Sequence, residues 1–340
     1  MRSAALAFLV PLGLLTATPA ALAQVPAPAV ACTVTDPELG ELSGLAADDD
    51  HWYATNDGGA AATVFVLGKD CQVQDVVTGP TDPYDVEDMA RAADGTFWLS
   101  DTGDNDADRE TVALISLSPA GESTLYRLTY PDGKHDAEAL LLAPDGTPFI
   151  VTKSPLGTAD VYRPAAPLTS PGPTPLRHVL AVRLSSTDTP GGPVPGIVGS
   201  VTVTGAATSP DGTAIALRTY TDAYLFPMKD GDVVGALSAK PVRIPLPDEA
   251  QGEAIAFQPD GSLLSASEGV GEPVRVVAGA ARLVAPKPPP GKPEPAAASN
   301  VSESPPAKEG LPAIPAATVT VVVVAVVYLL FRWTRRRKSY

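Results

Sequence analysis

The sequence predicts an all-β fold, a β-propeller of five four-stranded blades, on three observations. Four segments share one pattern: a polar residue, called the anchor here, stands at the start of an apolar run, and an Asp-Gly turn and a second strand follow. A weaker copy with three aspartates at its turn precedes them. In every copy the anchor lies seven positions before the turn aspartate and fourteen before a polar tip. Strand-forming residues separated by Gly, Pro and Asp fill the intervals. A fixed register inside a variable period is typical of one unit copied around a ring.

The anchors set the number of blades and the way the ring closes. They lie 44, 51, 66 and 49 residues apart, at Ser43, Glu87, Glu138, Thr204 and Glu253. The 32 residues that follow the last anchor up to position 285 and the 19 residues from 24 to the first anchor together make one more period. The ring therefore closes if residues 32–35 form the outer strand of the last blade, beside residues 273–277.

Each predicted blade divides into four short strands. In the second blade these are expected at residues 86–91, 96–100, 112–117 and 124–128. We expect no amphipathic helix within the repeats. A sixth blade is the alternative for the long third interval, but its segments 164–175 and 185–195 are rich in Pro and Gly and are interpreted as loops. A β-sandwich is the other alternative, and it does not predict the constant distance from anchor to turn.

The two ends of the chain predict export and a membrane anchor. Residues 1–23 combine an early arginine, an apolar run and an Ala-Leu-Ala cleavage site, as in a signal peptide. Residues 313–331 carry no charge and are long enough for a transmembrane helix. The basic segment 332–340 stays in the cytoplasm. The layout is then an extracellular propeller ectodomain over 24–285, a Pro/Ala-rich stalk over 286–312 and a single pass through the plasma membrane.

Charge and cysteine content narrow the possible partners. Six of the 24 basic residues lie in the two ends, which hold no acids, so residues 24–331 contain 18 basic and 39 acidic residues and carry a net charge of −21. Such a surface repels nucleic acid and anionic lipid and is compatible with bound cations. The two cysteines, Cys32 and Cys71, both lie in the exported part, where an oxidising compartment favours a disulfide between them. Two free buried thiols are the alternative.

Anchors and tips meet around one end of the central channel in a propeller, so their acids predict a metal site there. Several carboxylates facing one channel repel each other unless a cation neutralises them. Oxygen ligands from Asp, Glu and Asn suit Ca²⁺. The predicted ligands are Glu87, Asp101, Asp104, Asn105, Glu138 and Glu253. The alternative is that these acids cap backbone N–H groups or pair with neighbouring basic residues.

Other polar residues at the same end are candidates for ligand binding and catalysis. The predicted ligand-binding residues are Asn56, Asp57, Lys153, Arg218 and Glu268. His135 precedes an anchor and is a candidate general base, with a structural histidine as the alternative. The acidic run from Asp101 to Asp108 imitates the start of an EF-hand loop but has Arg109 where that motif needs glycine, so a loop of Asx-turns is an equal alternative.

Several short stretches resemble uncharacterised exported actinobacterial β-propeller proteins. They are Leu42–Ala46, Tyr53–Asp57, Asp85–Ala90, Gly103–Asn105, His135–Glu138 and Gly252–Ile255. This resemblance covers about residues 30–285. More distantly, the Glu-Ala anchors resemble those of phytase-like and lactonase-like propellers. That wider resemblance implies Ca²⁺ in the channel and hydrolysis of phosphoesters or lactones.

Two functions follow as expectations. The first is a membrane-anchored, cell-surface propeller that binds a divalent cation together with a small molecule or a cell-envelope component at the channel mouth. The alternative is a calcium-dependent hydrolase of the phosphoester or lactone type, with His135 accepting a proton. The sequence holds no Gly-x-Ser-x-Gly, His-Glu-x-x-His or P-loop motif, which argues against serine hydrolases, zincins and NTPases.

Overall fold

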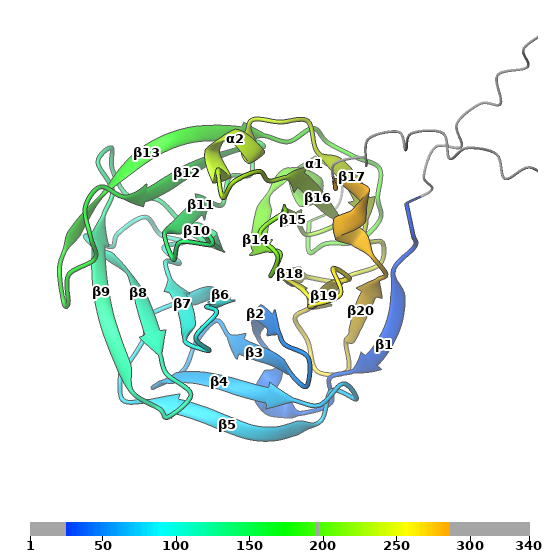
Figure 1. The fold of residues 1–340 in the computed structure, drawn as a ribbon, viewed down its shortest axis with the longest axis horizontal. Coiled ribbons are helices and arrows are strands. Elements are labelled where there is room, and N and C mark those ends of the chain that lie inside the picture. The colour runs from blue at the N-terminus through cyan, green and yellow to red at the C-terminus, as the bar shows by residue number, and fades with distance from the viewer. Residues whose placement is uncertain (1–24, 195–196, 286–340) are drawn as a thin grey trace, which may run out of the picture. The chain divides into compact units, whose positions relative to one another are not determined.

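The computed structural model describes residues 25–194 and 197–285, and the regular secondary structure of these residues is almost entirely β-strand. Figure 1 shows their strands arranged as small sheets around a central axis. The all-β prediction is confirmed. The two α-helices of the described residues, α1 (Ile197–Val201) and α2 (Val233–Leu237), have five residues each and lie outside the sheets; neither was predicted from the sequence.

Strands pair antiparallel in consecutive groups of four along the chain. The first group contains β2 (Leu42–Ala47), β3 (Trp52–Asn56), β4 (Ala62–Leu67) and β5 (Val73–Gly79). The second contains β6 (Val86–Arg91), β7 (Phe97–Asp101), β8 (Val112–Leu117) and β9 (Ser123–Thr129). Two of the four strands predicted for this second group have the observed bounds, and the other two differ by a single residue at each end.

The remaining groups follow the same order. The third contains β10 (Ala137–Leu142), β11 (Pro148–Thr152), β12 (Thr158–Pro164) and β13 (Thr174–Arg183). The fourth contains β14 (Val203–Thr208), β15 (Ala214–Thr219), β16 (Asp222–Pro227) and β17 (Val242–Pro245). A short parallel ladder between β13 and β9 joins the second and third groups into one eight-stranded sheet. The described part of the segment between β13 and β14 holds α1 and no strand.

The last group closes the ring with a strand from the other end of the chain. It contains β18 (Gly252–Phe257), β19 (Leu263–Ser267), β20 (Pro273–Val277) and β1 (Ala29–Thr33), and Cys32 faces Val274 across the final pair. Closure by the N-terminal strand is therefore confirmed, although the strand begins three residues earlier than predicted. A disulfide between Cys32 and Cys71, with 5.8 Å between the two Cα atoms, ties this strand to the β4–β5 turn.

The innermost strand of each group is the first one along the chain, as Figure 1 shows. Each of these five strands carries a β-bulge at the predicted anchor. In β6, for example, Val86 faces Asp101 and Asp88 faces Ser100, so that Glu87 is left over between them. The same one-residue shift occurs in β2, β10, β14 and β18. Because a bulge redirects its extra residue, it points the anchor side chain away from the pleat. The constant register in the sequence thus marks the bulge of each repeat.

The hydroxyl anchors and one buried acid join neighbouring inner strands. Ser43 donates its hydroxyl hydrogen to the carbonyl of Val86, at 2.9 Å, and Thr204 does the same to Gly252, at 2.8 Å. Asp88 is fully buried, and its Oδ2 accepts hydrogen bonds from the backbone N–H groups of Leu140 and Ala206, at 2.7 and 3.0 Å. These contacts hold β6 against β10 and β14, and so fix the strands that carry the channel acids.

The apolar core lies between neighbouring sheets. Leu45 and Phe65 of the first group, for instance, pack in one cluster with Leu264 and Val274 of the last. No helix in the described residues is long and apolar enough to cross a membrane. The predicted signal peptide (1–23), stalk (286–312), transmembrane helix (313–331) and basic tail (332–340) lie outside the described residues.

Candidate functional site

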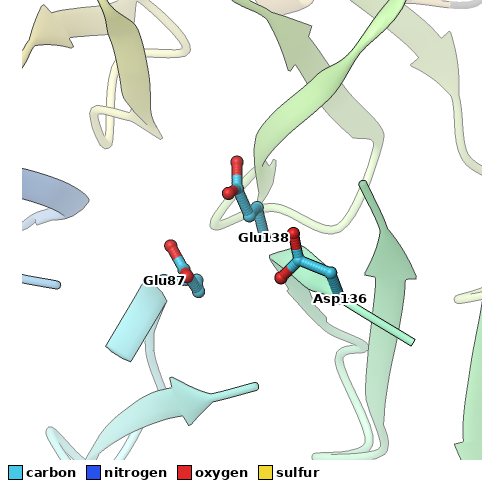
Figure 2. Close-up of side chains that lie close together, drawn as sticks. All are labelled: Glu87, Asp136 and Glu138. Carbon is cyan, nitrogen blue, oxygen red and sulfur yellow. The ribbon is translucent and has the colours of Figure 1, made fainter. Parts of the chain in front are cut away.

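Three carboxylates meet at the end of the channel where the inner strands begin. Glu87 and Glu138 are the bulge residues of β6 and β10, and Asp136 lies two positions before Glu138. One oxygen from each of the three lies within 4.8 Å of the others, and Figure 2 shows the three side chains close together. Glu87 and Glu138 are buried, whereas Asp136 is partly exposed. We call these three residues the carboxylate cluster.

One basic side chain reaches the carboxylate cluster. Lys153 follows β11, and its backbone N–H donates to the carbonyl of Asp136 at 2.9 Å, which places the side chain beside the cluster. Its ammonium forms an ion pair with Oε1 of Glu138. The other oxygen of Glu138, Oε2, is buried and has no hydrogen-bond partner within the described residues. One ammonium therefore faces three carboxylates.

Burial and mutual repulsion make the ionised form of these acids unfavourable. Burial, with Glu138, Asp85 and Asp136 adding to it, raises the pKa of Glu87 to about 10. Burial also raises the pKa of Glu138, to about 7, although Lys153 acts in the opposite direction. Glu138 in turn holds the pKa of Lys153 above its usual range despite the burial of the ammonium. The cluster is thus an electronegative site that would be stabilised by protons or by a cation.

A second pair of acids adjoins the carboxylate cluster. Glu253 is the bulge residue of β18, and Gln251 donates its side-chain amide to Glu253, at 3.2 Å, and to Glu268, at 2.5 Å. Burial and the hydrogen bond with Glu268 raise the pKa of Glu253 to about 11. Asp57, a predicted ligand-binding residue, donates its backbone N–H to the carbonyl of Glu41 at 3.0 Å. Burial and the charges of Glu41 and Glu268 raise the pKa of Asp57 to about 7.

The carboxylates of Asp101 and Asp104, in the acidic run that begins at the end of β7, already have hydrogen-bond partners, most of them in the same loop. Asp101 accepts hydrogen bonds from the Arg109 guanidinium at 2.9 Å and from the backbone of Asp85 at 3.0 Å. Oδ1 of Asp104 accepts from the backbone N–H groups of Asp108 and Arg109, at 2.9 and 3.1 Å. Asn105 is exposed. The loop therefore matches the Asx-turn alternative, and the predicted ligands Asp101, Asp104 and Asn105 are not part of the carboxylate cluster.

Two predicted ligand-binding residues, Arg218 and Asn56, donate side-chain hydrogen bonds to other residues of the protein. Arg218 has no exposed surface and donates to Glu249 at 2.7 Å. Its other hydrogen bonds go to the backbone carbonyls of Thr219, Tyr220, Ala254 and Ala266. This burial leaves Arg218 no surface for a ligand, so its predicted role in ligand binding gains no support from the structure. Asn56 donates its side-chain amide to the carbonyl of Glu38, while its side-chain oxygen is buried without a partner in the described residues.

His135 lies in a separate aromatic cluster. Its Nε2 is 3.1 Å from a carboxylate oxygen of Asp132 and 3.1 Å from the hydroxyl of Tyr162. The rings of Tyr130 and Tyr162 lie 4.9 and 5.3 Å from the imidazole. These contacts match the structural alternative, and none of them reaches the carboxylate cluster. Its role as a general base stays a prediction.

The opposite end of the channel has a different chemistry. A hollow of about 370 Å³ lies where the inner strands end, and its walls come largely from Ala, Pro and other apolar residues, among them Ala47, Ala143 and Phe257. The polar chemistry of the channel is therefore concentrated at the end where the inner strands begin.

Sequence reasoning missed Asp136 as a cluster member, although a signal for it exists. Each anchor is preceded, two positions earlier, by a residue able to form hydrogen bonds: Glu41, Asp85, Asp136, Thr202 and Gln251. This second register places a further polar group beside each bulge. Glu249, the partner of the buried Arg218, has no comparable signal, because it lies in the irregular segment between β17 and β18.

Comparisons with known proteins find only remote similarity. Neither the protein-family models nor the curated proteins give a match. Among solved structures, the chain is similar to virginiamycin B lyase from Staphylococcus aureus, with 15% identity over 72% of this chain and 71% of that one and a TM-score of 0.37. It is also similar to glutaminyl cyclase of Myxococcus xanthus, with 10% identity over 74% and 96% of the two chains and a TM-score of 0.42.

A third similar structure is a PQQ-bound aldose sugar dehydrogenase of Streptomyces coelicolor, with 12% identity over 75% of this chain and 99% of that one and a TM-score of 0.41. Similarities at this level carry no argument about function. The resemblance to exported actinobacterial propellers is not supported by these matches and stays a prediction. The site is therefore interpreted from its own geometry.

Proposed function

We propose that this chain is an exported five-bladed β-propeller, anchored in the plasma membrane, that binds a divalent cation at its carboxylate cluster. The cation and the surrounding mouth would then bind a small molecule or a cell-envelope component. The grouping of strands in fours supports the blade number. Export and anchoring rest on the sequence of residues 1–23 and 313–340.

The observation that carries the proposal is the buried, unpartnered oxygen of Glu138 beside two further carboxylates. A buried carboxylate oxygen without a hydrogen bond is costly, and neighbouring negative charges increase that cost. Lys153 pairs with only one of the three carboxyl groups. A divalent cation between Glu87, Asp136 and Glu138 would give the unpartnered oxygen a ligand bond and remove the repulsion.

The donor set fits calcium. Ca²⁺ takes oxygen ligands at about 2.3–2.6 Å in flexible geometry, so two of its ligands are separated by at most about 5 Å. The three carboxylate oxygens, all within 4.8 Å of one another, meet this limit. Neither histidine nor cysteine belongs to the cluster, so the softer ligands that zinc and copper favour are missing from it.

Isothermal titration of the full chain with CaCl₂ tests the proposal. We expect a single site in the wild type, and a loss of affinity of tenfold or more in Glu87→Gln and in Glu138→Gln, which keep the side-chain shape and remove the charge. Asp106→Asn is the matched control, since Asp106 is an exposed acid of the loop after β7 and no member of the cluster. Unchanged calcium affinity in both cluster variants would refute the proposed site.

A metal-dependent hydrolase of the phosphoester or lactone type is the second candidate. The observation in its favour is Glu253, which adjoins the cluster and whose raised pKa keeps it protonated at neutral pH. A protonated carboxyl group at that place can donate a proton to a leaving oxygen. Turnover of lactone and phosphodiester substrates that disappears with EDTA and in Glu253→Gln would establish the activity. Calcium binding without turnover would leave the binding function alone.

A further inference from the structure

We infer that Lys153 is an internal competitor of the divalent cation: its ammonium occupies Glu138, limits the affinity of the carboxylate cluster and makes the cluster discriminate against monovalent cations. This inference rests on the proposed function and adds a residue that determines affinity and selectivity. Three observations support it: the position of Lys153, the charges around it, and the difference between the two oxygens of Glu138, of which one is paired with Lys153 and the other has no partner in the described residues.

The backbone holds Lys153 beside the cluster in a defined way. Its N–H donates to the carbonyl of Asp136, so the strand end that carries the lysine is tied to the segment that carries a cluster acid. The side chain is about one fifth exposed, whereas that of Glu138 is almost fully buried. The ammonium can therefore move toward solvent while Glu138 stays in place. Among the ion pairs of the described residues, this is the one that involves the cluster.

The charges make the ammonium a competitor of the cation. Lys153 places one positive charge on Oε1 of Glu138 and leaves Oε2 without a partner. A divalent cation at the cluster either displaces this ammonium or binds next to it, and both cases reduce its affinity, through the lost ion pair or through repulsion between the two positive charges. A monovalent cation suffers the same penalty but brings half the charge. A monovalent cation at the cluster is therefore hardly more favourable than the Lys153 ammonium that is already there.

The opposite role for Lys153 predicts the opposite sign. If the lysine served mainly to hold Glu138 in the geometry that binds the cation, its removal would weaken calcium binding. The two roles are therefore separated by the direction of a single change in affinity.

The experiment compares the wild type with Lys153→Met, which keeps the length of the side chain and removes its charge, and with Lys153→Arg, which keeps the charge. Calcium is titrated into each full chain by calorimetry, at pH 8 in tetramethylammonium chloride, whose cation is too large for the cluster. We expect Lys153→Met to bind calcium about tenfold more tightly than the wild type and Lys153→Arg to stay within threefold of it. Equal or weaker binding by Lys153→Met would overturn the inference.

The competition between sodium and calcium provides a second measurement. It would be the same with and without Lys153 if the lysine had a purely structural role. Replacing tetramethylammonium by sodium at the same ionic strength should weaken calcium binding clearly in Lys153→Met and hardly at all in the wild type. Equal sodium effects in the two proteins would contradict the inference. Lys153→Gln, which stays polar, replaces the methionine variant if that variant does not fold. If the wild type binds calcium and the variants without the lysine charge bind it no more tightly, only the inference is refuted. If none of these proteins binds calcium, the proposed function is refuted.

Discussion

Two buried charge clusters of this protein are built in opposite ways. Between β15 and β18, Arg218 and Glu249 pair at 2.7 Å, and Arg275 and Ser265 contact the second oxygen of Glu249. Every partner of that cluster is supplied by the protein. The carboxylate cluster at the channel mouth instead contains three acids, a single ammonium and a buried oxygen with no partner in the described residues.

The difference separates a structural ion pair from a binding site. A buried charge whose hydrogen bonds are all satisfied fixes the surrounding backbone, and Arg218 does so by contacting four carbonyls. A buried charge left partly unsatisfied lowers the stability of the empty protein and gains from a ligand. We therefore expect the first cluster to govern folding and the second to govern cation binding, and four tests examine this division.

The largest effect is expected from Arg218→Met, which breaks the satisfied cluster. It removes the guanidinium from Glu249 and leaves four backbone carbonyls without that donor, so the free energy of unfolding should fall by about 3 kcal/mol or more. Urea unfolding monitored by tryptophan fluorescence measures it. A loss below about 1 kcal/mol would contradict the structural role of this cluster, and calcium affinity should stay unchanged wherever the variant is folded.

The pH dependence of stability tests the carboxylate cluster. The pKa of Glu87 is raised on folding, so its protonated form stabilises the fold fully below the ordinary value of 4.5, and this contribution is lost as pH rises toward about 10. In EDTA, Glu87 should therefore lower the free energy of unfolding by about 1 kcal/mol per pH unit between pH 6 and 8, in addition to the contribution of Glu253, whose pKa is also raised. Urea unfolding at three pH values measures the slope. Glu87→Gln should make this slope shallower by about 1 kcal/mol per pH unit, and Asp106→Asn should leave it unchanged; equal slopes in all three proteins would refute the assignment.

Two glycines give a matched comparison between the clusters. A methyl group at Gly252 would overlap the Arg218 guanidinium and lie 2.6 Å from the carbonyl oxygen of Tyr220, neither of which is free to move. The three heavy atoms nearest to a methyl group at Gly103 all belong to the carboxylate ends of Glu87 and Asp85, which it would overlap. Gly252→Ala should thus cost about 1–3 kcal/mol of stability with little effect on calcium affinity.

For Gly103→Ala the opposite pattern is expected, with a smaller loss of stability and a clear loss of calcium affinity, because the methyl group displaces a cluster carboxylate. Thermal melts and calcium titrations of both variants measure the two properties. If both glycine variants lost stability and affinity in the same proportion, the two clusters would not be functionally separate.

The smallest effect is expected at an anchor that already has its partner. Ser43→Ala removes the hydrogen bond to the carbonyl of Val86 and should lower the free energy of unfolding by about 1 kcal/mol, without changing calcium binding. Thr204→Ala, at the equivalent bulge, is the control and should behave alike. A change in calcium affinity in either variant would show that hydroxyl anchors contribute to the site.

The repeated register made the fold predictable, because each bulge needs the same number of residues before its turn. It located all five bulge residues, the residues left over at the two ends of the repeats located the closing strand, and the two cysteines of the exported part located the disulfide. The partner of each acid was not predictable, because the pairings depend on how the loops between the repeated strands fold. Asp101 was assigned to the metal although Arg109 neutralises it, and Arg218 was assigned to a ligand although Glu249 holds it inside the protein.

The central claim is that a divalent cation binds between Glu87, Asp136 and Glu138. The most direct measurement is an anomalous difference map from crystals of this protein soaked in terbium chloride, since Tb³⁺ takes the same oxygen ligands as Ca²⁺. The account predicts a dominant peak within bonding distance of all three carboxylates, absent from crystals of Glu87→Gln soaked in the same way. A map with no peak there, or with peaks only at exposed acids such as Asp106, would contradict it.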